Sequence, residues 1–381
     1  MSHLRAVHVI HALERGGAEA LLVDLATVAP DAGLELAVVS LMRLHDRRYA
    51  DALAARGVPV VALGLGTRWD PRALAAGVAA VGAHRPDVVH THLKHADLVG
   101  AAAARRLGIP MVSTLHVIED APTLLGRAKR RLAATARTST AARTIAVSEA
   151  QRRWYLQTFP VPPATVVTVP NGVLAPRPLR RGERAALRAR LGVDGCTALA
   201  VHVGIMRPGK GHAELLDALG RVPASVALRV VLAGDGELAP ELQAQADRLG
   251  LRPERVSFLG FRDDVPDLLD AADLVVSSSR FDALPTVLLQ ALAAGRPSVA
   301  TEVGGVPEVV TPAETLLVPA GDAEALATAI ARLATDDALR ARLATAARAR
   351  FLARFEASAW ARRLRGLYDE VLAERPRRAA S

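Results

Sequence analysis

Short apolar runs rich in β-branched residues alternate along this chain with longer stretches in which alanine, leucine and arginine recur at helical spacing. The first pattern predicts strands and the second predicts helices. Their alternation is typical of a parallel sheet covered by helices on both faces. In the first half of the chain the predicted strands are 6–10, 35–40, 58–63, 88–90, 111–114, 143–147 and 166–169. The predicted helices between them include 18–29, 72–84, 97–107 and 149–158.

The alternation pauses at the turn 170–172 and the proline-rich stretch 175–178, which together predict a linker. It then resumes with predicted strands at 197–203, 228–233, 256–259, 274–277, 298–301 and 315–318, and with helices at 212–219, 238–249, 285–294 and 323–334. We therefore predict an α/β protein with two doubly wound domains, residues 1–174 and 175–358, and a helix and tail at 359–381. Because ligands of such sheets bind at the carboxyl ends of the strands, we expect the site in a cleft between the domains.

The bulk properties narrow the class of protein. The chain has 381 residues, of which 51% are apolar, and this length exceeds the size of most single hydrophobic cores. The single cysteine, Cys196, excludes an internal disulfide and argues against a disulfide-stapled secreted protein. No apolar run approaches the ~18 residues that span a bilayer, and the stretch 6–10 is too short for a secretion signal. We therefore expect a cytoplasmic protein.

Positive charge is concentrated in the first half. The net charge is +9, and residues 1–174 carry 20 Lys and Arg against 13 Asp and Glu. Either an anionic partner meets this half, such as a phosphorylated acceptor or a membrane surface, or the charge is a solvated arginine-rich surface. Arg127, Lys129, Arg130 and Arg131 open an amphipathic helix that could make a peripheral contact with anionic lipid at the inner face of the membrane. A solvated helix face is the alternative.

The most informative stretch is 259–310. After a predicted strand it contains the runs FDALPTVLLQA at 281–291 and GGVPEVV at 304–310. In order and spacing these blocks resemble glycosyltransferase family 4, a group of retaining enzymes with the GT-B fold, and smaller matches extend the resemblance to roughly residues 6–345. The resemblance implies two Rossmann-like, doubly wound parallel-sheet domains facing a central cleft, with the helix near 359–372 crossing back onto the first. It also implies transfer of a sugar from a nucleotide-sugar donor.

The local chemistry of the first run fits this function. A strand leads to a loop that presents Asp282, and a helix is predicted to begin at Pro285, whose missing N–H has no partner in a first helical turn. The backbone N–H groups of Ala283 and Leu284 are then expected to point into the cleft and to bind hydroxyls or phosphate.

The resemblance assigns roles around this run. The family usually has a Glu-x7-Glu pattern, whose first carboxylate contacts the transferred sugar and whose second binds the ribose hydroxyls. Asp282 and Gln290 stand at these two places. Asp282 keeps the charge on a shorter arm, whereas Gln290 keeps only hydrogen-bonding capacity, which weakens the ribose contact. Glu308, in the second run, and Arg262, where the family's loop packs beside the base, complete the predicted donor-binding set in this region.

Residues 203–212, VGIMRPGKGH, resemble the strand, loop and helix that hold the donor diphosphate in this family. Cleavage of the sugar–diphosphate bond leaves negative charge on the β-phosphate, and without a metal, fixed cations and amide dipoles must stabilise it. Lys210 matches the family's lysine and Gly204 its first glycine. The family's arginine commonly follows that glycine directly, where this chain has Ile205, so we predict that Arg207 supplies the charge.

The first half contributes a glycine loop and a histidine. Gly16 and Gly17 allow close approach of the backbone to a ligand, near the diphosphate and acceptor in the family, although a simple tight turn explains them equally well. His116 matches the family's histidine near the donor sugar, where it could hydrogen-bond the sugar or assist proton movement. His90 and His92 suggest a metal pair, but no cysteine or carboxylate stands at ligand spacing, and no metal site is predicted.

These features together predict a retaining, metal-independent hexosyl- or related glycosyltransferase. His116, Arg207, Lys210 and Asp282 are its predicted catalytic residues, a UDP-sugar or GDP-sugar is its donor, and no cofactor is required. The acceptor is a sugar, a lipid-linked molecule or a small molecule, in polysaccharide, glycolipid or natural-product biosynthesis, and no nucleic-acid partner is predicted. A non-catalytic sugar-nucleotide-binding protein remains an alternative because of the two departures in the donor loops. An epimerase would need acid–base carboxylates in the cleft, and a phosphorylase a pyridoxal-binding lysine.

Overall fold

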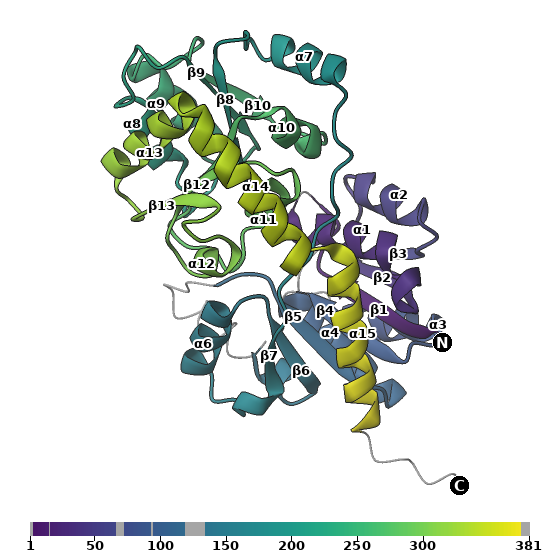
Figure 1. The fold of residues 1–381 in the computed structure, drawn as a ribbon. Helices are drawn as coiled ribbons and strands as arrows, with labels where there is room; N and C mark the ends of the chain where they lie inside the picture. The colour runs from purple at the N-terminus through teal and green to yellow at the C-terminus, as the bar shows by residue number, and fades with distance from the viewer. Residues whose placement is uncertain (1–2, 15, 66–71, 93, 119–133, 375–381) are drawn as a thin grey trace, which may run out of the picture. The chain divides into compact units, whose positions relative to one another are not determined.

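The computed structural model describes residues 3–14, 16–65, 72–92, 94–118 and 134–374. The chain divides into two compact units, which we call unit 1 (Met1–Gly172 with Ala357–Ser381) and unit 2 (Val173–Glu356). Each unit is built on one parallel sheet (Figure 1). Unit 1 is discontinuous in sequence because the C-terminal helix returns to it.

Seven parallel strands form the sheet of unit 1, in the order β3-β2-β1-β4-β5-β6-β7. The strands are β1 (Leu4–Ile10), β2 (Leu34–Met42), β3 (Val60–Leu65), β4 (Val88–His92), β5 (Met111–Leu115), β6 (Ala141–Ala146) and β7 (Val166–Thr168). The helices of this unit include α1 (Gly17–Val28), α2 (Arg48–Ala54), α3 (Arg72–Ala83), α4 (Lys94–Leu107), α6 (Glu149–Thr158) and α15 (Ala357–Ala373). All seven strands predicted for the first half are confirmed.

Six parallel strands form the sheet of unit 2, in the order β10-β9-β8-β11-β12-β13. The strands are β8 (Ala198–Val203), β9 (Leu228–Ala233), β10 (Val256–Gly260), β11 (Leu274–Ser277), β12 (Ser298–Thr301) and β13 (Thr315–Val318). The helices are α7 (Arg181–Arg190), α8 (His212–Leu219), α9 (Ala239–Arg248), α10 (Val265–Ala271), α11 (Thr286–Ala293), α12 (Val306–Val309), α13 (Ala323–Thr335) and α14 (Asp337–Arg354). The predicted α/β class with two doubly wound sheets is therefore confirmed.

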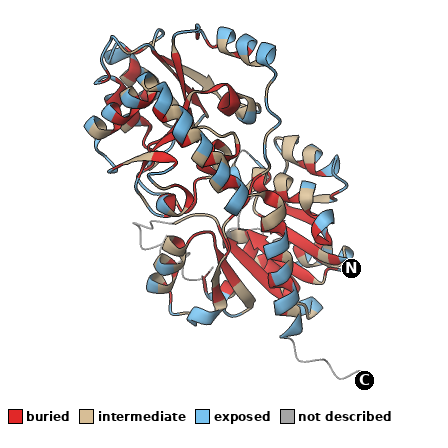
Figure 2. Cartoon of the chain, viewed as in Figure 1, coloured by how far each residue is buried: buried red, intermediate tan, exposed pale blue. Residues whose placement is uncertain are grey.

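Alternation of side chains along β1 and β4 sends two different sets of residues to the two faces of the sheet. Val7, Val9 and Val89 belong to an apolar cluster with residues of α3 and α4. His8 lies between Val7 and Val9, and His90 directly follows Val89. The two histidines pair in register, so both must point to the opposite face. That face is lined by apolar residues of α1 and α15. The strands are buried on both sides, as their red colour in Figure 2 shows.

The sheet of unit 2 is covered in the same way. Leu199, Val201 and Val275 pack in a cluster with residues of α7, α10 and α11. Ala200 and Val276, their neighbours in sequence, pack in a second cluster with residues of α8, α9 and α13. The near-continuous apolar strands of the sequence are thus explained by burial on both faces.

Five α-helices of the described chain were not among those predicted: α2, α7, α10, α12 and α14. In α7, Leu187 is the buried residue of a ten-residue helix whose other side chains are largely charged or small. A capping box stabilises its start, because Glu183 accepts a hydrogen bond from the backbone N–H of Arg180. Its single buried residue gives little apolar signal in the sequence, and α2, α10 and α12 are at most seven residues long. The longer helix α14 does bury a regular set, Leu339, Leu343, Ala347 and Phe351, so its apolar periodicity was present in the sequence and was missed.

The C-terminal helix α15 packs against the N-terminal part of unit 1. Trp360 and Leu364 line a small cavity together with residues of α1, and Tyr368 is fully buried. Arg365 donates a hydrogen bond to the carbonyl oxygen of Gly33 at 2.7 Å. Among the described helices, none combines the length and the apolar character needed to cross a membrane.

Candidate active site

Both sheets reverse their strand order at one place. In unit 1 the chain proceeds outward on either side from the neighbouring strands β1 and β4, and in unit 2 from β8 and β11. In doubly wound sheets, ligands bind at the carboxyl ends of the strands where this reversal occurs, because the two loops there run in opposite directions. The candidate residues therefore fall into two groups, one at each reversal.

Glycines bring the loops of unit 2 into close contact. Gly211 has a φ of 72°, and a Cβ there would stand 1.7 Å from the carbonyl oxygen of Ser278 in the loop after β11. The Ser278 hydroxyl donates to the carbonyl oxygen of Gly211 at 2.8 Å. A Cβ on Gly304, after β12, would stand 2.0 Å from the carbonyl oxygen of Asp282. That oxygen accepts a hydrogen bond from the N–H of Gly305 at 3.0 Å. The loops after β8, β11 and β12 therefore form one packed surface that a larger side chain at these glycines would push apart.

Two predicted catalytic residues meet on this surface. Lys210 Nζ lies 2.7 Å from Asp282 Oδ2, and the two side chains are 27% and 13% exposed. An ammonium carries three N–H donors, so this contact leaves two of them for other acceptors. The pair places a cation at the strand reversal, where an anionic ligand of unit 2 is expected.

The loop before α11 offers free backbone donors. Pro285 is the N-cap of this helix, with φ −67° and ψ 110°, so the helix begins at Thr286, one residue later than predicted. The N–H groups of Ala283 and Leu284 precede the helix and donate to no acceptor within the described part of the chain. They can serve a ligand as loop amides rather than as amides of the first helical turn. Gln290 follows within α11 and is half-buried.

The loop after β8 presents its remaining charge to solvent. Gly204 follows β8, and its N–H donates to the carbonyl oxygen of Ala233 at 3.0 Å. Ile205, at the family's arginine position, is 42% exposed. Arg207 is exposed and makes no ion pair with a described residue. Arg207, two residues beyond the family's arginine position, is therefore available to bind a ligand.

Two further predicted donor-binding residues, Arg262 and Glu308, are less accessible to a ligand than Arg207. Arg262 binds Asp264 through both carboxylate oxygens, with 2.7 Å between Nε and Oδ1. These hydrogen bonds raise the pKa of Arg262, so its guanidinium stays charged, and the carboxylate of Asp264 balances that charge. Glu308 lies on the short helix α12 and is half-buried.

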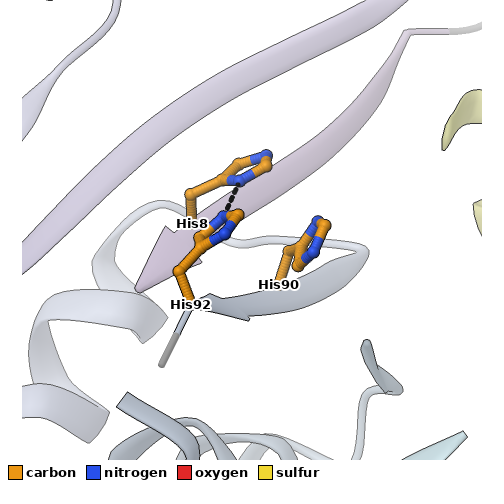
Figure 3. Close-up of side chains that lie close together, drawn as sticks. All are labelled: His8, His90 and His92. Carbon is orange, nitrogen blue, oxygen red and sulfur yellow. Dashed lines mark hydrogen bonds between the residues drawn. The ribbon is translucent and has the colours of Figure 1, made fainter. Parts of the chain in front are cut away.

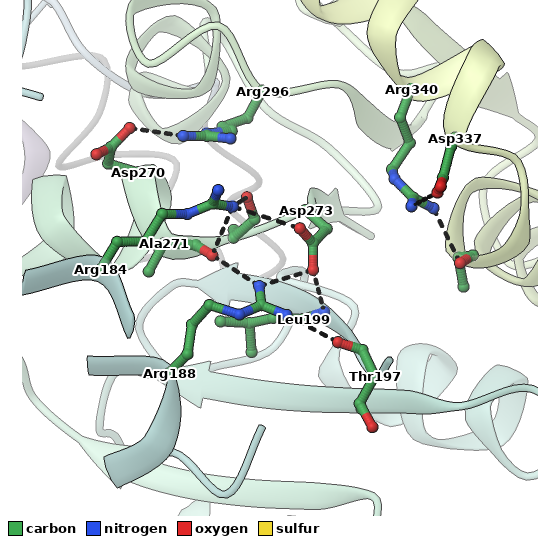
Figure 4. Close-up of polar contacts among 12 residues, drawn as sticks. Arg184, Arg188, Thr197, Leu199, Asp270, Ala271, Asp273, Arg296, Asp337 and Arg340 are labelled. Carbon is green, nitrogen blue, oxygen red and sulfur yellow. Dashed lines mark hydrogen bonds and ion pairs between the residues drawn. The ribbon is translucent and has the colours of Figure 1, made fainter. Parts of the chain in front are cut away.

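A second group of charges in unit 2 lies at the amino ends of the strands and is structural. Arg188 donates to Asp273 Oδ2 and to the carbonyl oxygen of Thr197, both at 2.8 Å (Figure 4). Asp270 accepts from Arg296 at 2.6 Å, and Arg184 reaches Asp273 at 3.4 Å (Figure 4). Asp273 directly precedes β11 and Thr197 directly precedes β8, so this network lies at the edge of the sheet opposite the site.

The glycine loop of unit 1 begins α1. Gly16 is the extended N-cap of this helix, and Gly17 is its first residue. A Cβ on Gly16 would stand 2.3 Å from Glu19 Oε2, so the glycine lets this carboxyl fold back over the start of the helix. Partial burial raises the pKa of Glu19 to about 7. Glu19 is therefore partly protonated at neutral pH and can donate or accept a hydrogen bond, a property that its position after two glycines did not reveal.

The strand reversal of unit 1 is lined by histidines (Figure 3). His8 Nδ1 lies 2.8 Å from His92 Nε2, and His92 Nδ1 lies 2.8 Å from His116 Nε2. His90 bonds instead to the hydroxyls of Tyr368, at 2.5 Å, and Thr114, at 2.7 Å. Burial lowers the pKa of His8 to about 3 and that of His116 to about 4, and it lowers the pKa values of His90 and His92 as well. All four rings are therefore neutral at neutral pH.

Sequence reasoning missed His8, because its partners are 82 or more residues away. One ring nitrogen from each of His8, His90 and His92 lies within 4.8 Å of the others, as a metal site requires. The spacing of His90 and His92 along the strand hinted at such a set, but only the register of β1 against β4 supplies its third member.

The opposite face of β4 holds a buried ion pair instead. Arg137 donates to Asp97 Oδ2 at 2.5 Å, and both side chains are almost fully buried. Thr91 and Ser113 donate to the other carboxylate oxygen of Asp97, and Tyr155 bonds to Arg137. All charges in this network are paired, so it stabilises the fold of unit 1.

Comparison with known proteins identifies the family to which this chain belongs. A family model described as Glycosyltransferase Family 4 matches residues 15–174, and one described as Glycosyl transferases group 1 matches residues 197–336. A D-inositol 3-phosphate glycosyltransferase from Xylanimonas cellulosilytica is 31% identical over 300 residues, which are 73% of this chain and 71% of that protein. The chain belongs to the group 1 and family 4 glycosyltransferases.

Other members of the family extend the comparison. A D-inositol 3-phosphate glycosyltransferase of Mycobacterium sp. strain KMS is 33% identical over 256 residues, 62% of this chain. The match spans only 57% of that relative's length. Among solved structures, Anabaena HepE in complex with UDP and glucose has a TM-score of 0.85 and 27% identity, with 97% of this chain and 100% of that chain covered. The GT-B fold is therefore shared along nearly the whole chain.

In this family member the structure brings only some of the predicted residues together. Lys210 and Asp282 are in contact in unit 2, and Gly204 and Arg207 belong to the same loop as Lys210. His116 in unit 1 is joined to His92. The basic residues predicted to touch a membrane, Arg127, Lys129, Arg130 and Arg131, lie outside the described residues.

Proposed function

We propose that this family member is a retaining glycosyltransferase that transfers a sugar from a UDP-sugar to an acceptor hydroxyl without a metal ion. The observation that carries the proposal is the contact between Lys210 and Asp282 at the strand reversal of unit 2. It combines a cation for a diphosphate with a carboxylate for a sugar hydroxyl, at the place where ligands of such sheets bind.

The chemistry follows from the donors at this surface. As the bond between the anomeric carbon and the diphosphate breaks, the β-phosphate gains negative charge. Lys210, Arg207 and the free N–H groups of Ala283 and Leu284 are fixed positive groups that stabilise this charge better in the transition state than in the ground state. The acceptor hydroxyl attacks from the face that the diphosphate leaves, so the anomeric configuration is retained and the diphosphate takes up the hydroxyl proton.

The remaining residues bind the rest of the donor in this proposal. Asp282 accepts from a sugar hydroxyl with the carboxylate capacity that Lys210 does not use, and Gln290 bonds to the ribose. His116 contributes from unit 1 as a neutral partner of the sugar. Gly16 and Gly17 allow the backbone to approach the diphosphate, and Arg262 and Glu308 complete the donor site.

A UDP-sugar donor is supported by solved relatives. Anabaena HepE has been crystallised with UDP-glucose, and that chain is 28% identical to this one with a TM-score of 0.82. The D-inositol 3-phosphate glycosyltransferases among the relatives suggest a phosphorylated polyol as the first acceptor to test. The positive charge of residues 1–174 is consistent with such an acceptor.

A donor screen tests the proposal first. Thermal unfolding is measured with UDP, GDP, ADP and dTDP and with their sugars, because a ligand that binds only the folded chain raises its stability by mass action. A UDP-sugar should raise the melting temperature and should be hydrolysed slowly in the absence of acceptor. If no nucleotide sugar binds, the proposal fails.

A second experiment tests stereochemistry and metal dependence. The donor selected in the screen is incubated with D-inositol 3-phosphate, simple glycosides and lipid-linked sugars, and proton NMR reads the anomeric configuration of the first product. Retention with equal rates in EDTA and in Mg²⁺ is expected. Inversion of configuration, or a rate that disappears in EDTA, would contradict the proposed mechanism.

A non-catalytic sugar-nucleotide-binding protein is the second candidate, and Gln290 is the observation that favours it. An amide at this place lacks the charge that strengthens a hydrogen bond to a ribose hydroxyl. Binding of a UDP-sugar without hydrolysis or transfer to any acceptor, in both the natural chain and Gln290→Glu, would establish this candidate instead.

A further inference from the structure

The three imidazoles at the strand reversal of unit 1 form a chain that runs from the interior to His116. His8, on β1, bonds through Nδ1 to Nε2 of His92, and His92, the last residue of β4, bonds through Nδ1 to Nε2 of His116. Each bond measures 2.8 Å. His8 and His92 are buried, and all three line the same small cavity.

The atoms joined in this chain restrict its protons. Both bonds connect an Nδ1 atom of one ring to an Nε2 atom of the next, and a neutral imidazole carries one proton and one lone pair. If His92 carries its proton on Nδ1, it donates to His116 and accepts from His8. The proton of His116 is then on Nδ1, and so is that of His8. If His92 carries its proton on Nε2, it donates to His8 and accepts from His116, so His8 and His116 also carry their protons on Nε2. The three rings must therefore share one tautomer.

The inner end of the chain selects between the two tautomers. His8 Nε2 is buried and has no hydrogen-bond partner among the described residues. In the Nε2–H state this atom would be a buried N–H without an acceptor, whereas in the Nδ1–H state it is a lone pair without a donor. Unpaired buried N–H groups are the rarer of the two in proteins. The Nδ1–H state is therefore the favoured one.

We propose that His8 and His92 are positioning residues that hold His116 in its Nδ1–H tautomer, so that His116 meets the donor sugar as a neutral hydrogen-bond donor. This inference rests on the proposed function for its consequence, but the tautomer itself is a property of the free protein. Burial supports the neutral state, because it lowers the pKa of each ring well below neutrality.

A bound metal ion is the competing explanation for the clustering of these histidines, but the geometry favours hydrogen bonds between them. Ligand nitrogens around a tetrahedral zinc ion stand about 3.3 Å apart, since each Zn–N bond is about 2.0–2.1 Å. The 2.8 Å between His8 Nδ1 and His92 Nε2 is instead a hydrogen-bond distance. Both ring nitrogens of His90 are engaged by Tyr368 and Thr114, which leaves no lone pair of that ring free for an ion.

Nitrogen NMR of the histidine rings tests the proposal directly in the full chain. Long-range proton–nitrogen spectra separate Nδ1–H from Nε2–H rings, and His116→Gln identifies the signals of His116. We expect the Nδ1–H pattern for His8, His92 and His116 at pH 7.5 without ligand. An Nε2–H pattern, or a mixture at His116, overturns the proposal whether or not the protein transfers a sugar.

Variants of His92 distinguish a role in positioning His116 from a purely structural role. His92→Phe fills the space but cannot donate to His116, whereas His92→Asn places an amide N–H near the position of Nδ1. The phenylalanine variant should release His116 from the Nδ1–H state and lower kcat about tenfold to a hundredfold with little change in KM, as loss of one buried hydrogen bond implies. The asparagine variant should recover the tautomer and most of the rate.

Tyr368→Phe is the matched control. It removes a buried hydroxyl from His90, in the same cluster, without touching the chain of three rings. Its His116 signals and kcat should equal those of the natural chain. Equal losses of kcat in Tyr368→Phe and His92→Phe, with unchanged His116 signals in both, would reduce His92 to a structural residue.

Elemental analysis distinguishes a metal site from a hydrogen-bonded chain of histidines. The protein as purified, without a histidine tag, should hold well under one equivalent of zinc, nickel, copper or iron per chain, and added zinc should leave the ring signals unchanged. About one equivalent of metal that is lost in His8→Phe would overturn the proposal in favour of a metal site.

Discussion

The two strand reversals of this molecule have the same topology, but one carries charged side chains and the other carries neutral ones. In unit 2 the reversal carries an ion pair, Lys210 with Asp282, on loops that glycines bring together. In unit 1 it carries His8, His92 and His116, which burial keeps neutral. The buried ion pair of unit 1, Arg137 with Asp97, lies instead on the opposite face of β4.

The difference follows from what each unit is proposed to bind. A diphosphate is charged and needs cations and amide donors that are partly open to solvent, whereas sugar hydroxyls are neutral and are recognised by neutral donors and acceptors. A charged residue among the histidines would itself need a partner, because an unpaired buried charge is strongly destabilising. The four predictions below test this division, from the largest expected effect to the smallest.

Replacement of the cation should affect activity far more than stability. Lys210→Met should lower kcat/KM for the UDP-sugar donor about a hundredfold to a thousandfold, as expected when a group that stabilises transition-state charge is lost. The free energy of unfolding in urea should change by less than about 1 kcal/mol, because the pair is partly exposed. Steady-state kinetics and urea titration measure the two effects.

Arg280→Met is the control for this prediction. Arg280 bonds to Glu214 and is exposed near the same loop. It should keep kcat/KM within about twofold of the natural value, since surface ion pairs contribute little. Equal activity losses in both variants would show that Lys210 has no special role.

The glycine that joins the loops of unit 2 should not tolerate a side chain. In Gly211→Ala the new Cβ meets the carbonyl oxygen of Ser278 at a positive φ, so the loops must separate. We expect a loss of at least about 2 kcal/mol in the free energy of unfolding, together with reduced donor binding. Gly182→Ala, in α7 and with open space around the new Cβ, should instead gain about 0.5–1 kcal/mol. The free energy of unfolding of both variants is measured in urea. If it changed in the same direction in both, the close contact between the loops at Gly211 would not be needed for stability.

Acidification should weaken the histidine cluster. The pKa of His8 is about 3 in the folded chain, against about 6.5 for an unfolded histidine. Between these values the unfolded chain binds a proton that the folded chain excludes, so stability is complete above about pH 6.5 and is lost as the pH falls. Each such histidine contributes a slope of at most about 1.4 kcal/mol per pH unit.

The His8→Phe variant should lose that part of the pH dependence. Hydrogen exchange at pH 7 and pH 5 should show β1 opening more readily at the lower pH in the natural chain. The change should be smaller in the variant. Unit 2 also buries two histidines of lowered pKa, His202 and His212, so its strand β8 provides an internal reference that His8→Phe should not alter. A variant with an unchanged pH dependence in β1 would argue against a neutral buried His8.

Restoring the family's carboxylate should have the smallest effect. Gln290→Glu should lower KM for the donor about fivefold, since a charge-assisted hydrogen bond to the ribose is stronger by about 1 kcal/mol. Gln157→Glu, on the exposed surface of α6, adds the same charge away from the site and should leave KM unchanged. An increase in KM for Gln290→Glu would mean that this residue does not face the ribose.

The sequence predicted the architecture well because the signals for it are local. Buried parallel strands produce short β-branched runs, so all the strands of both sheets were found with small shifts of their ends. Helices that are short or bury few residues, such as α7, give a weak apolar signal and were missed, whereas the regular apolar positions of α14 were overlooked. The start of α11 moved from Pro285 to Thr286, because backbone angles rather than residue type decide where a helix begins.

The residue types of the donor loops were also readable in the sequence, since glycines, Lys210 and Asp282 occur in motifs. Their contact was not, because Lys210 and Asp282 are 72 positions apart and follow different strands. The chain by itself determined the two sheets, the order of the loops and the residues they carry. Only the tertiary structure decided that Lys210 pairs with Asp282 and that His8 joins His92 and His116. Those partners are set by strand register and by the face to which each side chain points, and both depend on how whole strands pair.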